Sequence, residues 1–252
     1  MQTVLEAKIL VKNFGENRII RGLNIAIAKG ERHAVIGPNG AGKSTLFNLL
    51  TGYLKPTSGE ILLRGKNIAG LPPHLVNRAG LARSFQITAI FPALSVFENI
   101  RIAVMARHNA RYGLFRRVAA AKAINDNAWE LVERVRLMPI AEKLAGDITY
   151  SEQRALEIGM ALGPDGDVIL LDEPTAGMSR DEAAYMVELM RDVTTGKTLI
   201  VIEHDMSVVF SIADRISVLV YGEVVATDTP EAIRSNAKVQ EAYLGEENHE
   251  PA

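Results

Sequence analysis

One short run of residues constrains the fold of this chain more than any other, and it reads Gly37-Pro-Asn-Gly-Ala-Gly42-Lys43-Ser44-Thr45. A glycine, four further residues and then Gly-Lys-Ser form the pattern of a phosphate-binding loop between a strand and a helix. The flanking segments fit that context, because Arg32 to Ile36 has the composition of a short strand and Lys43 to Leu50 that of a helix. We therefore expect a strand, a tight loop and a helix at the centre of the fold.

Each residue type in this loop has a use in holding a triphosphate. Glycines let backbone N–H groups curl around a β-phosphate without an intervening side chain. Lys43 offers its charge to the β- and γ-phosphates, Ser44 offers a hydroxyl to Mg²⁺, and the following helix directs its positive end at the phosphates. The alternative is a glycine-rich turn with an unrelated lysine, and the strand and helix on either side argue against it. The expected ligands are ATP and Mg²⁺, and the expected nucleotide contacts are Gly37, Asn39, Gly40, Ala41, Gly42, Lys43, Ser44 and Thr45.

A second segment supplies two carboxylates, and it reads Val168-Ile-Leu-Leu-Asp172-Glu173-Pro174. A buried strand that ends in aspartate is how P-loop enzymes bring a carboxylate to the shell of Mg²⁺. Glu173 follows at once, and we expect it to act as a general base or to position the attacking water. The alternative is a strand followed by an acidic turn, which the phosphate loop upstream makes the weaker interpretation.

Strand-like and helix-like segments alternate along most of the chain, which predicts an α/β fold with a mostly parallel sheet. The expected strands are Val4–Val11, Leu23–Ala28, Arg32–Ile36, Ile61–Leu63, Leu81–Phe85, Val168–Leu171, Thr198–Ile202 and Ile216–Val220. The expected helices flanking the later strands are Asp181–Val193 and Met206–Ala213. From Ser95 to about Leu162 nearly every segment favours a helix, so we expect a helical block inserted into the sheet-containing core.

Composition and charge narrow the class of protein. The 252 residues suffice for one large domain, and a formal net charge of -2 gives no reason to expect a nucleic-acid partner. The absence of cysteine excludes disulfides and thiolate metal sites. We expect no signal peptide, and no stretch approaches the roughly 20 apolar residues of a membrane span. If the protein works at a membrane, we expect a partner to hold it there.

Three further segments, taken with the phosphate loop and the acidic pair, resemble the ABC ATPase family over about Val4 to Glu246. They contain Gln86 in Arg-Ser-Phe-Gln, His204 in Val-Ile-Glu-His-Asp, and Phe14 in Asn-Phe-Gly. The resemblance implies that Gln86 links Mg²⁺ and water to the helical subdomain, and that His204 contacts the γ-phosphate. It also implies that Phe14 stacks on adenine, which an aromatic ring does with little selectivity for the base.

The resemblance also divides the chain. It implies a single ABC ATPase domain with a P-loop core at residues 1–86 and 165–252, which includes an antiparallel β subdomain, and an inserted helical subdomain at residues 87–164. The family's signature corresponds to residues 148–154, Ile-Thr-Tyr-Ser-Glu-Gln-Arg. Thr149, Ser151 and Glu152 are then expected to begin a helix that faces the γ-phosphate on a second ATPase subunit.

The signature departs from the common form at Ser151, where the family usually has glycine. A side chain at this position either crowds the γ-phosphate or adds a hydrogen-bond donor to it. The ATP site would be formed by the phosphate loop of one subunit and the signature of the other, and we expect the contribution of this signature to be weaker or tuned. A second departure is Ser179, which replaces the usual aspartate in the loop after Glu173.

Within the family, the chain is similar to the ATPases of branched-chain and hydrophobic amino-acid importers. The similarity lies in the extra segment around Met105 to Lys122, in the run after the signature and in the tail up to Gly245. It implies ATP hydrolysis coupled to uptake of a small solute. It also implies a second ATPase subunit of a different chain, transmembrane permease subunits as partners, and a peripheral position on the cytoplasmic face of the inner membrane. The basic run from Arg101 to Lys122 suits anionic headgroups or an acidic permease loop, or is simply a solvated helical face.

Three other functions stay open on the sequence. The ATPase of a lipopolysaccharide-export system has a similar Tyr-Leu-Gly tail, although the long insertion argues against it. A non-transport ABC ATPase of DNA repair or translation usually carries two ATPase units, zinc sites or basic arms. A non-hydrolysing regulatory partner is suggested by Ser151 and opposed by the intact Lys43, Asp172, Glu173 and His204.

Overall fold

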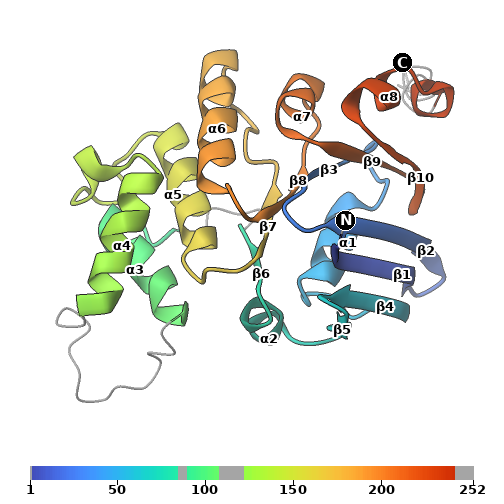
Figure 1. Cartoon of the computed structure of the whole chain (residues 1–252), viewed down its shortest axis with the longest axis horizontal. Helices are drawn as coiled ribbons and strands as arrows, with labels where there is room; N and C mark the ends of the chain where they lie inside the picture. Colours follow the sequence, from blue (N-terminus) through green and yellow to red (C-terminus); the bar gives the residue numbers. More distant parts are fainter. Residues whose placement is uncertain (1, 85–89, 108–121, 242–252) are drawn as a thin grey trace.

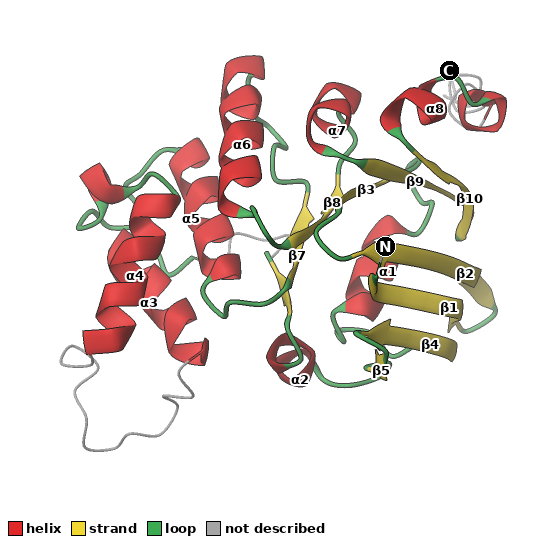
Figure 2. Ribbon diagram, viewed as in Figure 1, coloured by secondary structure: helices red, strands yellow, loops and turns green. Residues whose placement is uncertain are grey.

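The larger of two sheets forms the middle of the molecule. The computed structural model describes residues 2–84, 90–107 and 122–241, and Figures 1 and 2 show their arrangement. The larger sheet has the strand order β10-β9-β3-β8-β7-β6, and every pairing in it is parallel except that of β10 with β9. Its strands are β3 (Arg32–Ile36), β6 (Leu81–Arg83), β7 (Val168–Asp172), β8 (Thr198–Ile202), β9 (Arg215–Val220) and β10 (Glu223–Asp228). The predicted α/β fold with a mostly parallel sheet is confirmed.

The smaller sheet is antiparallel throughout and has the order β2-β1-β4-β5. Its strands are β1 (Thr3–Phe14), β2 (Asn17–Ala28), β4 (Ser58–Leu63) and β5 (Lys66–Asn67). Figure 1 places this sheet beside α1, at the opposite end of the molecule from α3 and α4.

Helices surround the larger sheet, and three of them form a separate lobe. The helices are α1 (Lys43–Leu50), α2 (Pro73–Arg78), α3 (Val96–Arg107), α4 (Lys122–Arg134), α5 (Tyr150–Leu162), α6 (Arg180–Val193), α7 (Met206–Ile212) and α8 (Pro230–Arg234). A 3-10 turn spans Met138–Ile140. Helices α3, α4 and α5 pack on one another at one end of the molecule (Figure 1), where Phe97 of α3 stacks on Trp129 of α4 with ring centroids 4.1 Å apart. We refer to this group of helices as the helical lobe.

The larger sheet separates two hydrophobic cores. Side chains of a strand alternate between its two faces, so Ile169 and Leu171 join the core that continues into the helical lobe. Val168 and Leu170 of the same strand join the core formed by α1 and the antiparallel sheet. All four are fully buried, which explains why this strand reads as an unbroken apolar run.

The predicted and observed elements differ mainly at the edges of the sheets. The bounds of β3, α1 and β8 are those predicted. Strand β6 ends at Arg83, two residues before the predicted end, and of these two Ser84 follows the strand whereas Phe85 lies outside the described residues. The edge strand β10 is not predicted, because it is only partly buried and lacks a continuous apolar run. Gln86 and residues 108–121 of the extra segment, with most of its basic run, also lie outside the described residues.

Within the part of the chain that the structure describes, no helix has both the length and the apolar character that crossing a bilayer requires.

A buried polar network closes the amino end of β3. His33 is fully buried, its Nδ1 lies 2.6 Å from Glu31 Oε1, and its Nε2 lies 2.8 Å from the Ser217 hydroxyl. Burial by itself raises the pKa of Glu31, but His33 and the Ala28 N–H, which donates to the carboxylate, outweigh burial. The pKa of Glu31 therefore lies below its usual value.

Glu31→Gln is expected to lower the free energy of unfolding by about 2 kcal/mol at neutral pH, because hydrogen bonds to an ionised carboxylate are lost. Since folding lowers the pKa of Glu31, this stabilisation is present above the usual carboxyl pKa and is lost as the pH falls through the lowered value. Urea unfolding of both proteins from about pH 7 to about pH 3 measures the difference. A difference in unfolding free energy between the two proteins that stays constant over this pH range would contradict the lowered pKa of Glu31.

Candidate nucleotide-binding site

The phosphate loop leaves the carboxyl end of β3 and enters α1. Gly37 has φ 154°, and a Cβ at this position would overlap the carbonyl oxygen of Leu219 on the neighbouring strand. Gly42 has φ 102° and caps α1, and a Cβ there would press on the side chain of Ile20 at 3.0 Å. Both positions therefore require glycine for reasons of backbone conformation and space.

The residues of the phosphate loop differ in their contacts and in their exposure to solvent. Lys43 Nζ donates to the carbonyl oxygens of Gly37 and Pro38, so the ammonium lies over the loop. Ala41 is buried and its carbonyl accepts from the Gly222 N–H at 2.9 Å, which ties the loop to the β9–β10 turn. The remaining predicted contacts are partly or fully open to solvent, namely Asn39, Gly40, Ser44 and Thr45.

The two predicted carboxylates and the predicted histidine come together because β7 and β8 are neighbours. Asp172 ends β7 opposite Ile202 of β8, and the Glu173 N–H donates to the Ile202 carbonyl at 2.9 Å. His204 Nδ1 lies 4.0 Å from Glu173 Oε1, and both side chains are open to water. Glu173 has φ 47°, an uncommon conformation for a residue with a Cβ, and such positions cluster at functional sites.

Asp172 differs from Glu173 in its surroundings. Its side chain is 1% exposed, and its Oδ1 is a buried atom with no hydrogen-bond partner among the described residues. Burial raises the pKa of Asp172, and the charges of Arg83 and Lys43 oppose that shift. The unpartnered Asp172 oxygen and the exposed Ser44 hydroxyl near the start of α1 are oxygen donors of the kind that a hard cation such as Mg²⁺ prefers.

The predicted adenine contact lies at the end of the antiparallel sheet where β1 turns into β2. Phe14 ends β1, its side chain is 46% exposed, and Lys12 Nζ lies 4.8 Å from the ring centroid. The strand that pairs with it, β2, continues to Ile19 and Ile20 beside Gly42 of the phosphate loop. The ring is thus exposed, and β2 connects its end of the sheet to the residues beside the loop.

The signature segment begins α5, as predicted. Thr149 is the N-cap, its backbone N–H donates to Glu152 Oε2 at 2.7 Å, and the Glu152 N–H donates back to the Thr149 hydroxyl. This capping box leaves the first turn of α5 half open to solvent. Figure 1 shows α5 in the helical lobe, across β6 and β7 from α1, so the signature and the phosphate loop of one chain lie apart.

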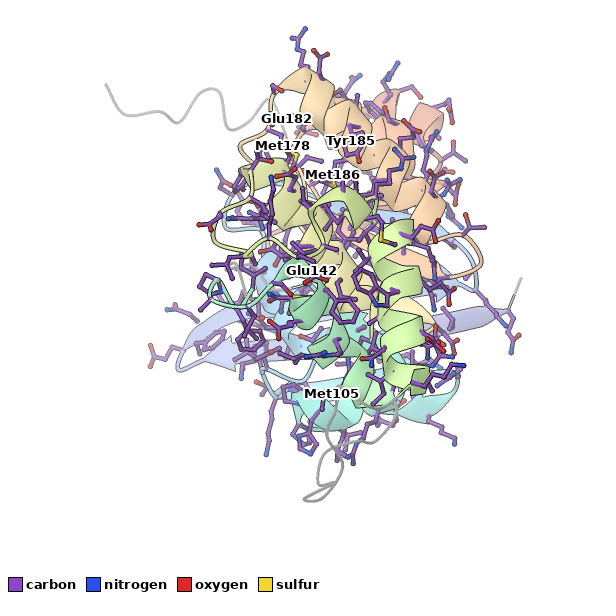
Figure 3. The ribbon with its side chains drawn as sticks, turned by 90° about the vertical axis from the view of Figure 1, so that its left-hand side faces the viewer. Met105, Glu142, Met178, Glu182, Tyr185 and Met186 are labelled. Carbon is purple, nitrogen blue, oxygen red and sulfur yellow. The ribbon has the colours of Figure 1, made fainter. Side chains whose placement is uncertain are left out.

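The signature contacts the loop that follows Glu173. The Tyr150 hydroxyl donates to the Ala176 carbonyl at 2.9 Å, and Ser179 caps α6 through a second capping box with Glu182. Hydrogen bonds from the Ser179 N–H and hydroxyl lower the pKa of Glu182. A hydrogen bond from the Ser151 side chain lowers this pKa further, by a smaller amount. Figure 3, viewed from the left-hand side of Figure 1, shows Met178 and Glu182 close together near the top and Met105 near the bottom.

Two charged residues at the site have no role assigned by the sequence analysis. Glu203 is fully buried and accepts from the Thr175 N–H at 3.0 Å and the Thr175 hydroxyl at 2.7 Å, which joins the end of β8 to the loop after Glu173. Arg83 pairs with Asp172. Both residues lie in segments that carry the family resemblance. Their partners, Thr175 and Asp172, are distant in the sequence, so no local pattern indicates the contacts.

Comparisons with known proteins match most of the chain to one family. Residues 20–176 match the ABC transporter family, and residues 223–249 match the branched-chain amino acid ATP-binding cassette transporter family. The chain is 38% identical to the high-affinity branched-chain amino acid transport ATP-binding protein LivG of Escherichia coli K12, over 97% of this chain and 99% of that protein. It is 37% identical to the high-affinity branched-chain amino acid transport ATP-binding protein BraF of Pseudomonas aeruginosa, over 96% and 98%.

A solved structure shares the arrangement of the whole fold. The ADP conformation of MJ1267, an ATP-binding cassette of an ABC transporter, matches with a TM-score of 0.85 and 27% identity, over 97% of this chain and 100% of that one. A family match over more than half of the chain, full-length relatives and a full-length structural match all agree. The chain therefore belongs to the ABC transporter family of ATP-binding cassettes.

Proposed function

We propose that the chain is the ATP-binding and hydrolysing subunit of an ABC importer that takes up branched-chain or other hydrophobic amino acids. One observation carries the ATPase part of this proposal, namely that Lys43 of the phosphate loop, Asp172 and Glu173 meet at one edge of the parallel sheet. The choice of importer rests on the full-length similarity to LivG and BraF and on the match of the tail.

The proposed chemistry follows from the position of each residue. The loop N–H groups and Lys43 hold the β- and γ-phosphates, and Phe14 stacks on the adenine. Glu173 orients the attacking water and accepts its proton, and His204, 4.0 Å away, contacts the γ-phosphate. Ser44, Asp172 and, by family resemblance, Gln86 are the proposed holders of Mg²⁺, which when bound neutralises charge on the phosphates.

The proposed assembly is a pair of ATPase subunits arranged head to tail beneath transmembrane permease subunits. The phosphate loop and the signature lie apart in one chain, so Thr149, Ser151 and Glu152 are proposed to contact the ATP held by the other subunit. We assign residues 1–86 and 165–252 to the nucleotide-binding core and residues 87–164 to the inserted helical subdomain. A peripheral position at the cytoplasmic face of the membrane follows from binding to the permeases.

Capture of the tagged protein from membranes of its own host tests the proposal. Two permease chains and a second, different ATPase in the retained complex are the expected result. Retention of lipopolysaccharide-export components would replace the importer with the runner-up function. If no membrane protein is retained although the protein hydrolyses ATP, the transporter assignment is wrong.

Ser151→Gly is expected to raise the ATPase rate of the assembled complex about twofold or more, because the signature helix then approaches the phosphate without a side chain in between. About 0.5 kcal/mol in the barrier corresponds to this factor. The measurement is phosphate release by the purified complex, with Ser211→Gly of α7 as a control that also places glycine in a helix. An unchanged rate for Ser151→Gly would contradict the hypothesis that the side chain at this position limits the ATPase rate.

A further inference from the structure

An arginine with no role in the chemistry proposed above lies against the carboxylate proposed to hold the metal. Arg83 is the last residue of β6, and its Nη2 donates to Asp172 Oδ2 at 2.8 Å. The two side chains are 8% and 1% exposed, so the ion pair is shielded from water. Arg83 lies opposite Leu170 in the parallel pairing of β6 with β7, two residues before the carboxylate.

The other arm of the same guanidinium reaches the helix that follows the phosphate loop. Arg83 Nη1 donates to Asn48 Oδ1 at 2.6 Å and to the Thr51 hydroxyl oxygen at 3.3 Å. Asn48 belongs to α1, and Thr51 is its C-cap residue. The planar fork of an arginine can hold two partners in fixed directions, which a lysine ammonium cannot do. Arg83 thereby joins the end of β7 to α1, the helix that carries Lys43 and Ser44 at its start.

The pairing leaves the two oxygens of Asp172 unequal. Oδ2 is held by Arg83, whereas Oδ1 is buried and has no hydrogen-bond partner among the residues that the structure describes. Buried polar atoms are nearly always partnered, so an oxygen in this state is suited to an external ligand. The ion pair prevents the carboxylate from rotating, and Oδ1 therefore keeps one direction.

We propose that Arg83 is a positioning residue for the metal site, holding Asp172 by one oxygen so that the other is oriented toward Mg²⁺ or a water in its shell. This inference rests on the proposed function. Partners that hydrogen-bond to metal-ligating carboxylates typically contribute roughly 10–100-fold to metal affinity. Arg83 touches neither the nucleotide nor the metal in this assignment, and it acts through Asp172 and α1.

Mn²⁺ is a suitable probe, because free Mn²⁺ is counted by electron paramagnetic resonance without any turnover. The titration uses the full chain saturated with a non-hydrolysable ATP analogue. For Arg83→Gln we expect the Kd for Mn²⁺ to rise roughly 10–100-fold. Arg83→Lys keeps the charge without the fork, and we expect an intermediate rise. Affinity for the analogue without metal should change by less than about threefold in both variants, since the phosphate loop is intact.

Arg32→Gln is the matched control, because Arg32 also forms a two-armed pair with a carboxylate, Asp214, at the amino end of β3. Its Mn²⁺ affinity should equal that of the parent protein. Circular dichroism identifies the variants that fold, and Arg83→Lys keeps the test decisive if Arg83→Gln unfolds, since it preserves the counter-ion of a buried carboxylate.

Parent-like Mn²⁺ affinity in a folded Arg83→Lys and Arg83→Gln would overturn the inference. An equal loss of metal-free analogue binding would also overturn it, because Arg83 would then support the loop rather than the metal. If the parent protein itself fails to bind the analogue, the proposed ATPase function fails, which is a separate result.

Discussion

Glu173→Gln is expected to reduce ATP turnover by roughly 10²–10⁴-fold while ATP remains bound, because the amide cannot accept the proton of the attacking water. The substitution keeps the size of the side chain and the N–H of residue 173, which donates to the Ile202 carbonyl at 2.9 Å. The unusual φ of 47° at this position is therefore retained. Phosphate release measures turnover, and nucleotide that stays with the protein through rapid gel filtration measures trapping.

Glu188→Gln of α6 is a suitable control, since Glu188 is 66% exposed and pairs with Arg136 on the surface. It should have the turnover of the parent protein. Near-normal turnover of Glu173→Gln would remove Glu173 from the proposed role and direct attention to His204, whose Nδ1 lies 4.0 Å from Glu173 Oε1.

Lys43→Ala is expected to weaken ATP binding about 10–100-fold, because hydrogen bonds to a charged group contribute about 1.5–3 kcal/mol and each 1.4 kcal/mol is a factor of ten. The loop should keep its fold, because the hydrogen bonds of Lys43 Nζ to the Gly37 and Pro38 carbonyls are lost while the close packing around Gly37 and Gly42 remains. Turnover should fall further than affinity, because Lys43 also balances charge that develops on the γ-phosphate.

Lys197→Ala removes an equivalent ammonium, one that pairs with Asp165 at 2.9 Å, and should leave ATP affinity unchanged. Equilibrium binding of a fluorescent ATP analogue separates the two variants. The role of Lys43 would be refuted by an alanine variant that binds the analogue as tightly as the parent protein does.

The alternating pattern of strands and helices was sufficient to predict the central sheet and the element bounds around the loop. The bounds of β3 and α1 agree with the sequence because a buried apolar run, an obligatory glycine at position 42 and a helix-forming run all act locally. The capping box at Thr149 and Glu152 is local for the same reason, since its two hydrogen bonds join residues three apart. The edge strand β10 has no comparable local pattern and forms because β9 offers it a free edge.

The candidate site shows the same division between local and non-local information. By itself the sequence determined the phosphate loop, the acidic pair at the end of β7 and the cap of the signature helix, because these depend on residues close together in the chain. Only the tertiary structure decided that β8 lies between β3 and β7, which brings His204 to Glu173, and that β6 lies beside β7, which brings Arg83 to Asp172. Strand order depends on the packing of two cores against opposite faces of one sheet, and residues far apart in sequence carry no local signal of that packing.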